Sequence, residues 1–144
     1  MSAGLSARNC FEGTVTGLQP GAINTEVTLT LAGGDKIVAV VTQTSVQALG
    51  LAVGAPAVAL VKAPWVMLQA GSPKYRFSAR NQLAGTVSAV RKGAVNSEVA
   101  LTLPGGSQVH AIVTNDAVAE LDLKPGSAAT ALIKSSHVVL GVPA

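Results

Sequence analysis

The sequence of 144 residues repeats itself after 72 residues without a gap. Ser6-Ala7-Arg8-Asn9 returns as Ser78-Ala79-Arg80-Asn81, and Gly21-Ala22-Ile23-Asn24 returns as Gly93-Ala94-Val95-Asn96. Nearly half of the aligned positions are identical. A fixed period of this kind indicates a duplicated structural unit. We therefore predict two copies of one small domain, over residues 5–69 and 77–141, joined by a linker at residues 70–76.

Each repeat has the pattern of short strands joined by tight turns. Residues 26–31 alternate polar and apolar side chains, which is typical of a half-buried strand. Residues 32–35 supply a glycine-rich turn before a second apolar segment at residues 36–42, so the two segments form a hairpin.

A short helix is predicted after the hairpin. Thr44 and Gln47 have the spacing of a helix start, and Gly50 is a typical helix end. Asp116 occupies the position of Thr44 in the second repeat. Three strands, a short helix and further strand make up a small barrel of the OB type. We expect an all-β chain of two tandem OB-like five-stranded Greek-key barrels, each with one short helix.

Residues 57–61 and 129–133 are apolar at almost every position. A strand of this kind is covered on both faces, one by its own barrel and the other by a neighbour. Only 12% of the residues are charged, so a monomer of this size exposes much apolar surface. We therefore expect an oligomer with an apolar interface.

Composition excludes several classes of protein. The net charge of +3 is small and the basic residues are scattered, which argues against nucleic-acid binding. Cys10 is the single cysteine, so no intrachain disulfide forms, and the two histidines lie far apart, without a metal-ligand cluster. Residues 1–9 lack the layout of a secretory signal, and no apolar run is long enough to cross a membrane. We expect a cytoplasmic protein.

The polar residues that both repeats share are mostly hydrogen-bond donors, which suits a tetrahedral dianion. They include no nucleophile beside a base, so we expect no enzyme. The shared pairs are Ser6 and Ser78, Arg8 and Arg80, Asn9 and Asn81, Thr14 and Thr86, Asn24 and Asn96, Glu26 and Glu98, Thr42 and Thr114, and Lys62 and Lys134.

The repeated charges also have purely structural interpretations. Lys62 and Lys134 end apolar strands, where a lysine can simply reach water. Arg8 and Arg80 can pair with the repeated glutamates across the barrel, which positions the loop without touching a ligand. Both roles can coexist.

Other polar positions have structural interpretations as well. Asn24 and Asn96 follow turns and can cap their own backbone. Gly33-Gly34 is interpreted as a hairpin turn and not a phosphate loop, because no helix follows it directly. Four residues without an identical counterpart in the other repeat are expected to be packing or surface residues: Trp65, Tyr75, His110 and His137.

The repeated motifs resemble those of the Mop family, the molbindins or molybdenum-pterin-binding proteins. The motifs are Ser-Ala-Arg-Asn, Gly-Thr-Val, Gly-Ala-(Ile/Val)-Asn-x-Glu-Val, Gly-Gly, Val-Thr and Leu-(Val/Ile)-Lys. The match covers about residues 5–68 and 77–140, and the chain is similar to two-repeat members. This resemblance implies an OB-like barrel per repeat, a homotrimer, and molybdate or tungstate sites at subunit interfaces that serve storage or homeostasis.

The resemblance also implies the contact residues, which bind the metal as an oxyanion and not through direct side-chain ligands. They are Ser6, Ala7, Arg8, Asn9, Lys62 and Ala63, with Ser78, Ala79, Arg80, Asn81, Lys134 and Ser135. A weaker set of candidates is Ala22, Asn24, Thr42, Ser45, Ala94, Asn96 and Thr114. Ser135 replaces Ala63 and Ala117 replaces Ser45, so we expect unequal sites.

Three other functions compete with a free-standing binding protein. A molybdate-sensing interaction or regulatory module is the main alternative, although no nucleotide-binding or helix-turn-helix motif is present. An OB barrel for single-stranded nucleic acid needs exposed aromatic residues, and aromatic residues make up only 3% of the chain. An enzyme is the least supported.

Overall fold

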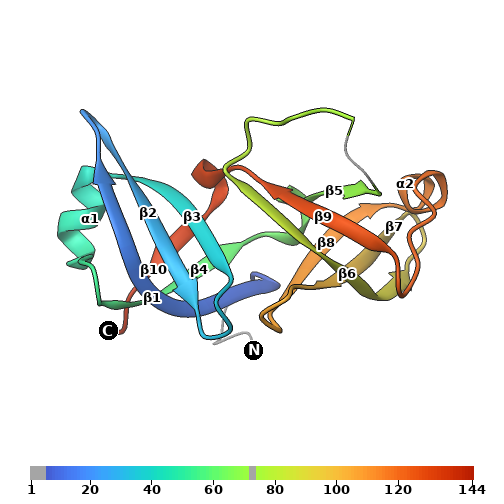
Figure 1. Ribbon diagram of the computed structural model, residues 1–144, viewed down its shortest axis with the longest axis horizontal. Coiled ribbons are helices and arrows are strands. Elements are labelled where there is room, and N and C mark those ends of the chain that lie inside the picture. Colours follow the sequence, from blue (N-terminus) through green and yellow to red (C-terminus); the bar gives the residue numbers. More distant parts are fainter. Residues whose placement is uncertain (1–5, 72–73) are drawn as a thin grey trace.

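The computed structural model describes residues 6–71 and 74–144 and contains two five-stranded antiparallel units (Figure 1). The first half of the chain forms β1 (Asn9–Pro20), β2 (Asn24–Leu31), β3 (Lys36–Thr42), α1 (Gln43–Leu49), β4 (Pro56–Val61), the 3-10 helix η1 (Ala63–Trp65) and β5 (Met67–Ala70). The second half forms β6 (Asn81–Lys92), β7 (Asn96–Thr102), β8 (Gln108–Thr114), α2 (Asn115–Glu120), β9 (Ala128–Ile133), η2 (Ser135–His137) and β10 (Val139–Gly141). The predicted all-β class is confirmed.

The two units exchange their last strands. The strand order is β10-β4-β1-β2-β3 in one sheet and β5-β9-β6-β7-β8 in the other. Figure 1 shows this directly, because the red β10 lies among blue and cyan strands and the green β5 lies among yellow and orange ones. Each sheet curls so that its exchanged strand also approaches the opposite edge, β3 or β8. The sequence repeats and the sheets therefore do not coincide.

Alternation along the strands builds the core. In β2, Thr25, Val27, Leu29 and Leu31 are buried and the residues between them are partly exposed. The register between β1 and β2 shifts between Val15 and Gly17, and the same shift recurs between β6 and β7. A bulge of this kind increases the local twist, which helps a small sheet close on itself.

The α-helices begin two residues earlier than predicted. Thr42 caps α1, because its backbone is extended and its hydroxyl accepts a hydrogen bond from the Ser45 amide. Thr114 caps α2 in the same way. The predictions of Thr44 and Asp116 as caps were therefore wrong, because the hairpin strand runs directly into the helix. Gly50 ends α1 in the left-handed conformation, as predicted.

The outer face of β4 is only partly covered within one chain, and that of β9 is covered more fully. Ala57, Ala59 and Val61 are buried, whereas Val58 and Leu60 are half-buried. In β9, Ala131, Leu132 and Ile133 are all buried.

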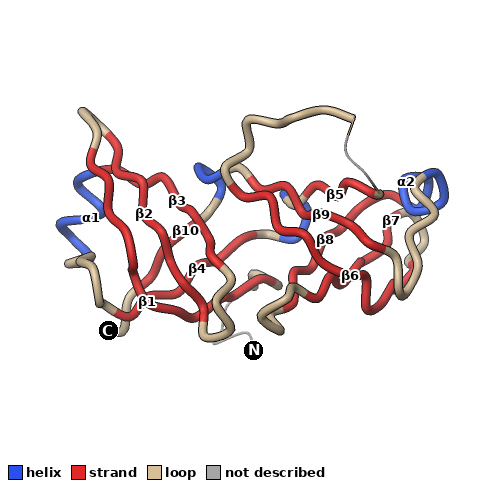
Figure 2. Tube along the Cα trace, viewed as in Figure 1, coloured by secondary structure: helices blue, strands red, loops and turns tan. Residues whose placement is uncertain are grey.

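The tips of the β2–β3 and β7–β8 hairpins meet at the junction of the units. The Gly105 amide donates to both carboxylate oxygens of Asp35, at 3.2 and 3.1 Å. In Figure 2 the two groups of strands are also connected by the runs from β4 to β5 and from β9 to β10. Within residues 6–71 and 74–144, no helix is both long and apolar enough to cross a membrane.

Candidate oxyanion-binding site

The strand register brings the repeated Ser-Ala-Arg-Asn segment next to the repeated lysine. Asn9 pairs with Val61 between β1 and β4, so Arg8 and Lys62 extend from the same end of this strand pair. Asn81 pairs with Ile133 between β6 and β9 in the equivalent way. The two sequence segments that we predicted to share a ligand are therefore neighbours in both repeats.

In the second repeat these segments line a cavity of about 290 Å³. Its wall is made of Ser78, Ala79, Arg80, Lys134 and Ser135, together with Met67, Phe77 and Leu132. Five of the six residues predicted for this repeat thus come together. Among the described residues, none of those that line this cavity is acidic, so its charged groups are one guanidinium and one ammonium.

Met67 belongs to the exchanged strand β5, which pairs with β9. The cavity of the second repeat therefore has a wall from the first half of the chain. Val139 stands at the equivalent position of the first unit, where β10 pairs with β4. Both side chains are exposed, at 53% for Met67 and 57% for Val139. Sequence reasoning missed Met67 because the residue is not repeated and the strand exchange was not expected.

The repeated arginines pair with the repeated glutamates, each with the glutamate of the other half. Arg80 donates from Nε to Glu26 Oε2 at 3.1 Å and from Nη2 to Glu26 Oε1 at 2.7 Å. Arg8 donates from Nη2 to Glu98 Oε1 at 2.6 Å. These hydrogen bonds raise the pKa of Arg80 and lower the pKa of Glu98. Both arginine side chains are more than half exposed, so each pair is a modest contribution to stability.

The side chains of Asn9 and Asn81 are buried and bridge the two units. The Asn9 amide donates to the carbonyl of His110 and accepts from its backbone N–H, at 2.8 and 2.7 Å. Asn81 makes the same pair of bonds with Val38, both at 2.7 Å. Each amide extends the pairing edge of the other unit by one residue. Asn81 is not among the residues that line the cavity.

The repeated lysines and their neighbours differ in exposure. Lys62 and Lys134 are exposed, Ala63 is buried and Ser135 is half-buried. The Lys62 ammonium lies 5.8 Å from the centre of the Trp65 ring. Trp65 and His137 hold equivalent positions in η1 and η2, and their rings meet with centroids 4.9 Å apart. In the first repeat, Ser6 is exposed and Ala7 is half-buried.

The weaker candidates gather at the other end of the strands. Asn24 pairs with Thr42, and Asn96 pairs with Thr114, at the ends of the hairpins. Ala22, Asn24, Ala94 and Asn96 are exposed. The hydroxyls of Thr42 and Thr114 cap helices, and Ser45 bonds to Thr42. These residues form a second group, separate from the cavity.

Comparisons with known proteins show the family to which the chain belongs. A family model described as the TOBE domain matches residues 5–68 and 78–140. The molybdenum transport protein ModE of Herbaspirillum seropedicae is 45% identical over 142 residues, which are 99% of this chain and 53% of that protein. The molybdenum-pterin-binding protein MopA of Rhodobacter capsulatus is 44% identical over 138 residues, which are 96% of this chain and 52% of that protein. The chain thus spans about half the length of the curated relatives it matches.

One solved structure matches this chain over nearly the whole of its own length, unlike the two relatives above. The cytoplasmic molybdate-binding protein ModG, in a form with molybdate bound, superposes with a TM-score of 0.92 at 56% sequence identity. The match covers 97% of this chain and 99% of that one. The resemblance to two-repeat proteins of the Mop family is confirmed, and the chain belongs to the TOBE domain family, of which it carries two copies.

Proposed function

We propose that this chain binds molybdate or tungstate reversibly and serves as a non-catalytic store or carrier. The observation that supports this most directly is the cavity in which Arg80 and Lys134 face the same space as Ser78 and Ser135. The bound form of ModG, to which the chain is 56% identical, supports the choice of oxyanion. The MopA relative supports the same class of ligand.

The chemistry of the cavity fits a dianion without protons. Arginine and lysine only donate, and Ser78, Ser135 and nearby backbone amides add further donors. Molybdate and tungstate present only acceptors near neutral pH. Phosphate keeps a proton there, which needs an acceptor, and leaving it buried without one costs about 1–3 kcal/mol. Sulfate has no proton, so its rejection rests on size and is less complete.

The proposal includes a homotrimer in the cytoplasm that takes no nucleic acid or membrane as a partner. Val58 and Leu60 on β4 and the exposed Ile23, Val95 and Met67 provide apolar surface for subunit contacts. The exposure of Lys62 and Lys134 to solvent supports completion of the sites by a neighbouring subunit. Light scattering tests the oligomer, and a monodisperse monomer at micromolar concentration would contradict it.

Titration calorimetry with molybdate, tungstate, sulfate and phosphate tests the ligand. We expect the order molybdate and tungstate, then sulfate, then phosphate. The double variant Lys62→Met and Lys134→Met keeps most of the stem packing and removes both ammonium groups, so oxyanion affinity falls while the oligomer persists. Lys124→Met is the matched control, because Lys124 lies in a loop and contacts Asp122 at 3.4 Å. An unchanged affinity in the double variant would show that the two lysines have a structural role and do not bind the oxyanion.

A molybdate-sensing module is the second candidate, because relatives named ModE are about twice the length of this chain. A module of this kind changes its contacts with a partner when molybdate binds. Capture of a partner by the immobilised protein with and without molybdate separates the two. Equal capture in both states supports storage, and molybdate-dependent capture supports sensing.

A further inference from the structure

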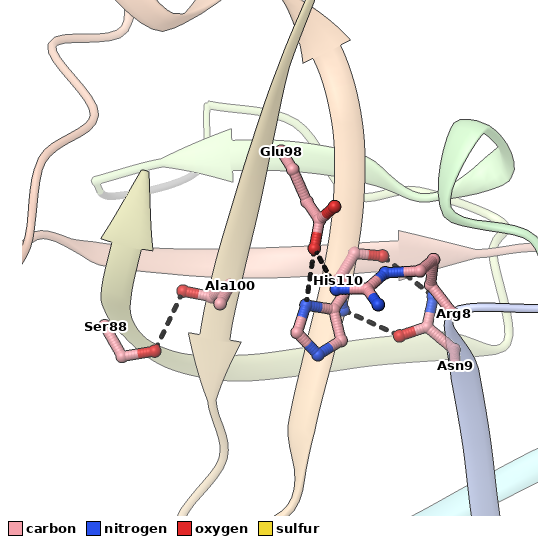
Figure 3. A network of polar contacts seen from close by, with 6 residues as sticks. All are labelled: Arg8, Asn9, Ser88, Glu98, Ala100 and His110. Atoms are coloured by element: carbon pink, nitrogen blue, oxygen red, sulfur yellow. Dashed lines mark hydrogen bonds and ion pairs between the residues drawn. The ribbon is translucent and has the colours of Figure 1, made fainter. Parts of the chain in front are cut away.

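His110 lies where it can affect Arg8, one of the predicted oxyanion contacts. Figure 3 shows that Arg8, Glu98 and His110 converge, with the Arg8 guanidinium and the His110 ring directed at one carboxylate. Glu98 Oε1 is 2.6 Å from Arg8 Nη2 and 3.2 Å from His110 Nδ1. One oxygen therefore faces two nitrogen groups.

The backbone fixes this arrangement. Asn9 follows Arg8 in the chain, and its side-chain amide bonds to both backbone groups of His110. The bonds hold the start of β1 against β8 (Figure 3). His110 and Arg8 are thereby kept on the same side of this contact, next to Glu98 on β7.

The second repeat provides an internal comparison. The counterpart of His110 is Val38 of the first repeat, which pairs with Asn81, the residue after Arg80, through the same two bonds. Arg80 then holds its glutamate through two hydrogen bonds, whereas Arg8 makes one. The pair with a neighbouring imidazole therefore has one hydrogen bond, and the pair with a neighbouring isopropyl group has two.

We propose that His110 is a positioning residue for Arg8: by facing the carboxylate oxygen that holds Arg8, it leaves this guanidinium easier to redirect to an oxyanion than Arg80. The proposal rests on the proposed function for its ligand. On this proposal the two repeats have unequal sites because of His110, a residue outside the repeated motifs. Glu98 is the shared partner, and Arg8 is the group that moves.

The charges around His110 set the direction of the effect. A cavity of about 260 Å³ beside it is lined by Arg8, Arg91 and Glu98, with Ser88 and Gln108 among its polar residues. Burial first, and then the positive charge of Arg8, lower the pKa of His110. A dianion at Arg8 offsets that positive charge, so it favours the protonated imidazole. By reciprocity, protonation of His110 favours the bound oxyanion at Arg8.

The experiment uses the full chain, with Lys134→Met in the samples that test His110, so that the site of the first repeat dominates their titration. Molybdate affinity is measured by calorimetry at about pH 5 and about pH 8, the limits of the range in which histidine ordinarily titrates. We expect on the order of fivefold tighter binding at the lower pH with His110 present. His110→Val removes most of this gain. A further variant combines Lys62→Met with Val38→His and keeps Lys134. In this variant we expect the site of the second repeat to gain the tighter binding at the lower pH.

A spectroscopic measurement without ligand separates this inference from the proposed function. The Nε–Hε signal of Arg8 in the nitrogen-labelled protein shifts between the two pH values when His110 is present and stays in place in His110→Val. Equal pH profiles and equal signals in both proteins would overturn the inference, with molybdate binding left standing. Absence of molybdate binding in the unaltered chain would overturn the proposed function, and the Arg8 signal would still decide the role of His110.

Discussion

Gly33 and Gly105 approach so closely that neither position accepts a side chain. A Cβ atom on Gly33 would lie 1.9 Å from the carbonyl oxygen of Gly105, and one on Gly105 would lie 2.7 Å from that of Gly33. Both glycines lie in hairpin turns, so this contact joins the tips of the two units. The Gly-Gly motif therefore serves the junction between repeats in addition to turning the chain.

Gly33→Ala is expected to destabilise the protein by about 1–3 kcal/mol, because two backbone segments must separate to admit the methyl group. Urea unfolding measures the loss. Gly17→Ala is the control, since its Cβ would meet only the Thr28 side chain, at 3.4 Å. A loss at Gly33 no larger than that at Gly17 would mean that the hairpin tips separate without cost.

Asn9→Ala is expected to cost about 1–3 kcal/mol, because it leaves the partly buried backbone groups of His110 without the partners that the Asn9 amide provides. Asn9→Asp is expected to be at least as harmful, since a carboxylate oxygen would then face the His110 carbonyl. Denaturant midpoints give both values, and Asn24→Ala is an exposed control. Equal midpoints for Asn9→Ala and Asn24→Ala would contradict the bridging role of the buried amide.

The sequence predicted the strands, the hairpins and the short helices because local patterning determines them. It could not predict which unit each last strand joins. Val66-x-Leu68 and Val138-x-Leu140 are alike, and each sequence can complete either sheet. Met67 and Val139 then take equivalent places in opposite units. Which sheet each last strand joins therefore depends on the path of the chain between the units and not on the pattern of side chains.

The residues that line the cavity could be predicted to the extent that the two repeats share them. Ser78, Arg80 and Lys134 meet in one cavity because the strand register is repeated along with the motif. His110 could not be found in this way, because its counterpart in the first repeat is Val38. A residue that differs between the repeats cannot be found by comparing the polar residues that both repeats share.

The strand exchange predicts that damage in one half of the sequence appears in the other unit. Leu140→Ala should accelerate amide hydrogen exchange in β4, because Leu140 pairs with Ala59. Leu68→Ala should accelerate exchange in β9 through its pairing with Ala131. Leu140 is buried, so its replacement should also cost about 2–5 kcal/mol. Faster exchange confined to the mutated half would contradict the exchange of strands.

Stability is expected to fall with acid in two stages around Arg8. The folded pKa of His110 lies below 6.5, so the unfolded chain binds the proton more readily and stability decreases as the pH falls below that value. The pKa of Glu98 lies below 4.5, mainly because Arg8 donates a hydrogen bond to it. Its contribution is present above that value and is lost as the pH falls through the folded pKa.

Urea midpoints measured from neutral pH downward should therefore decline in the histidine range first and in the carboxylate range later. His110→Val should abolish the first decline and keep the second, because Glu98 still accepts from Arg8. Val38→His should add a decline in the histidine range, since an imidazole then stands beside the Arg80–Glu26 pair. A His110→Val protein that loses stability over the histidine range as steeply as the unaltered chain would show that some other group causes it.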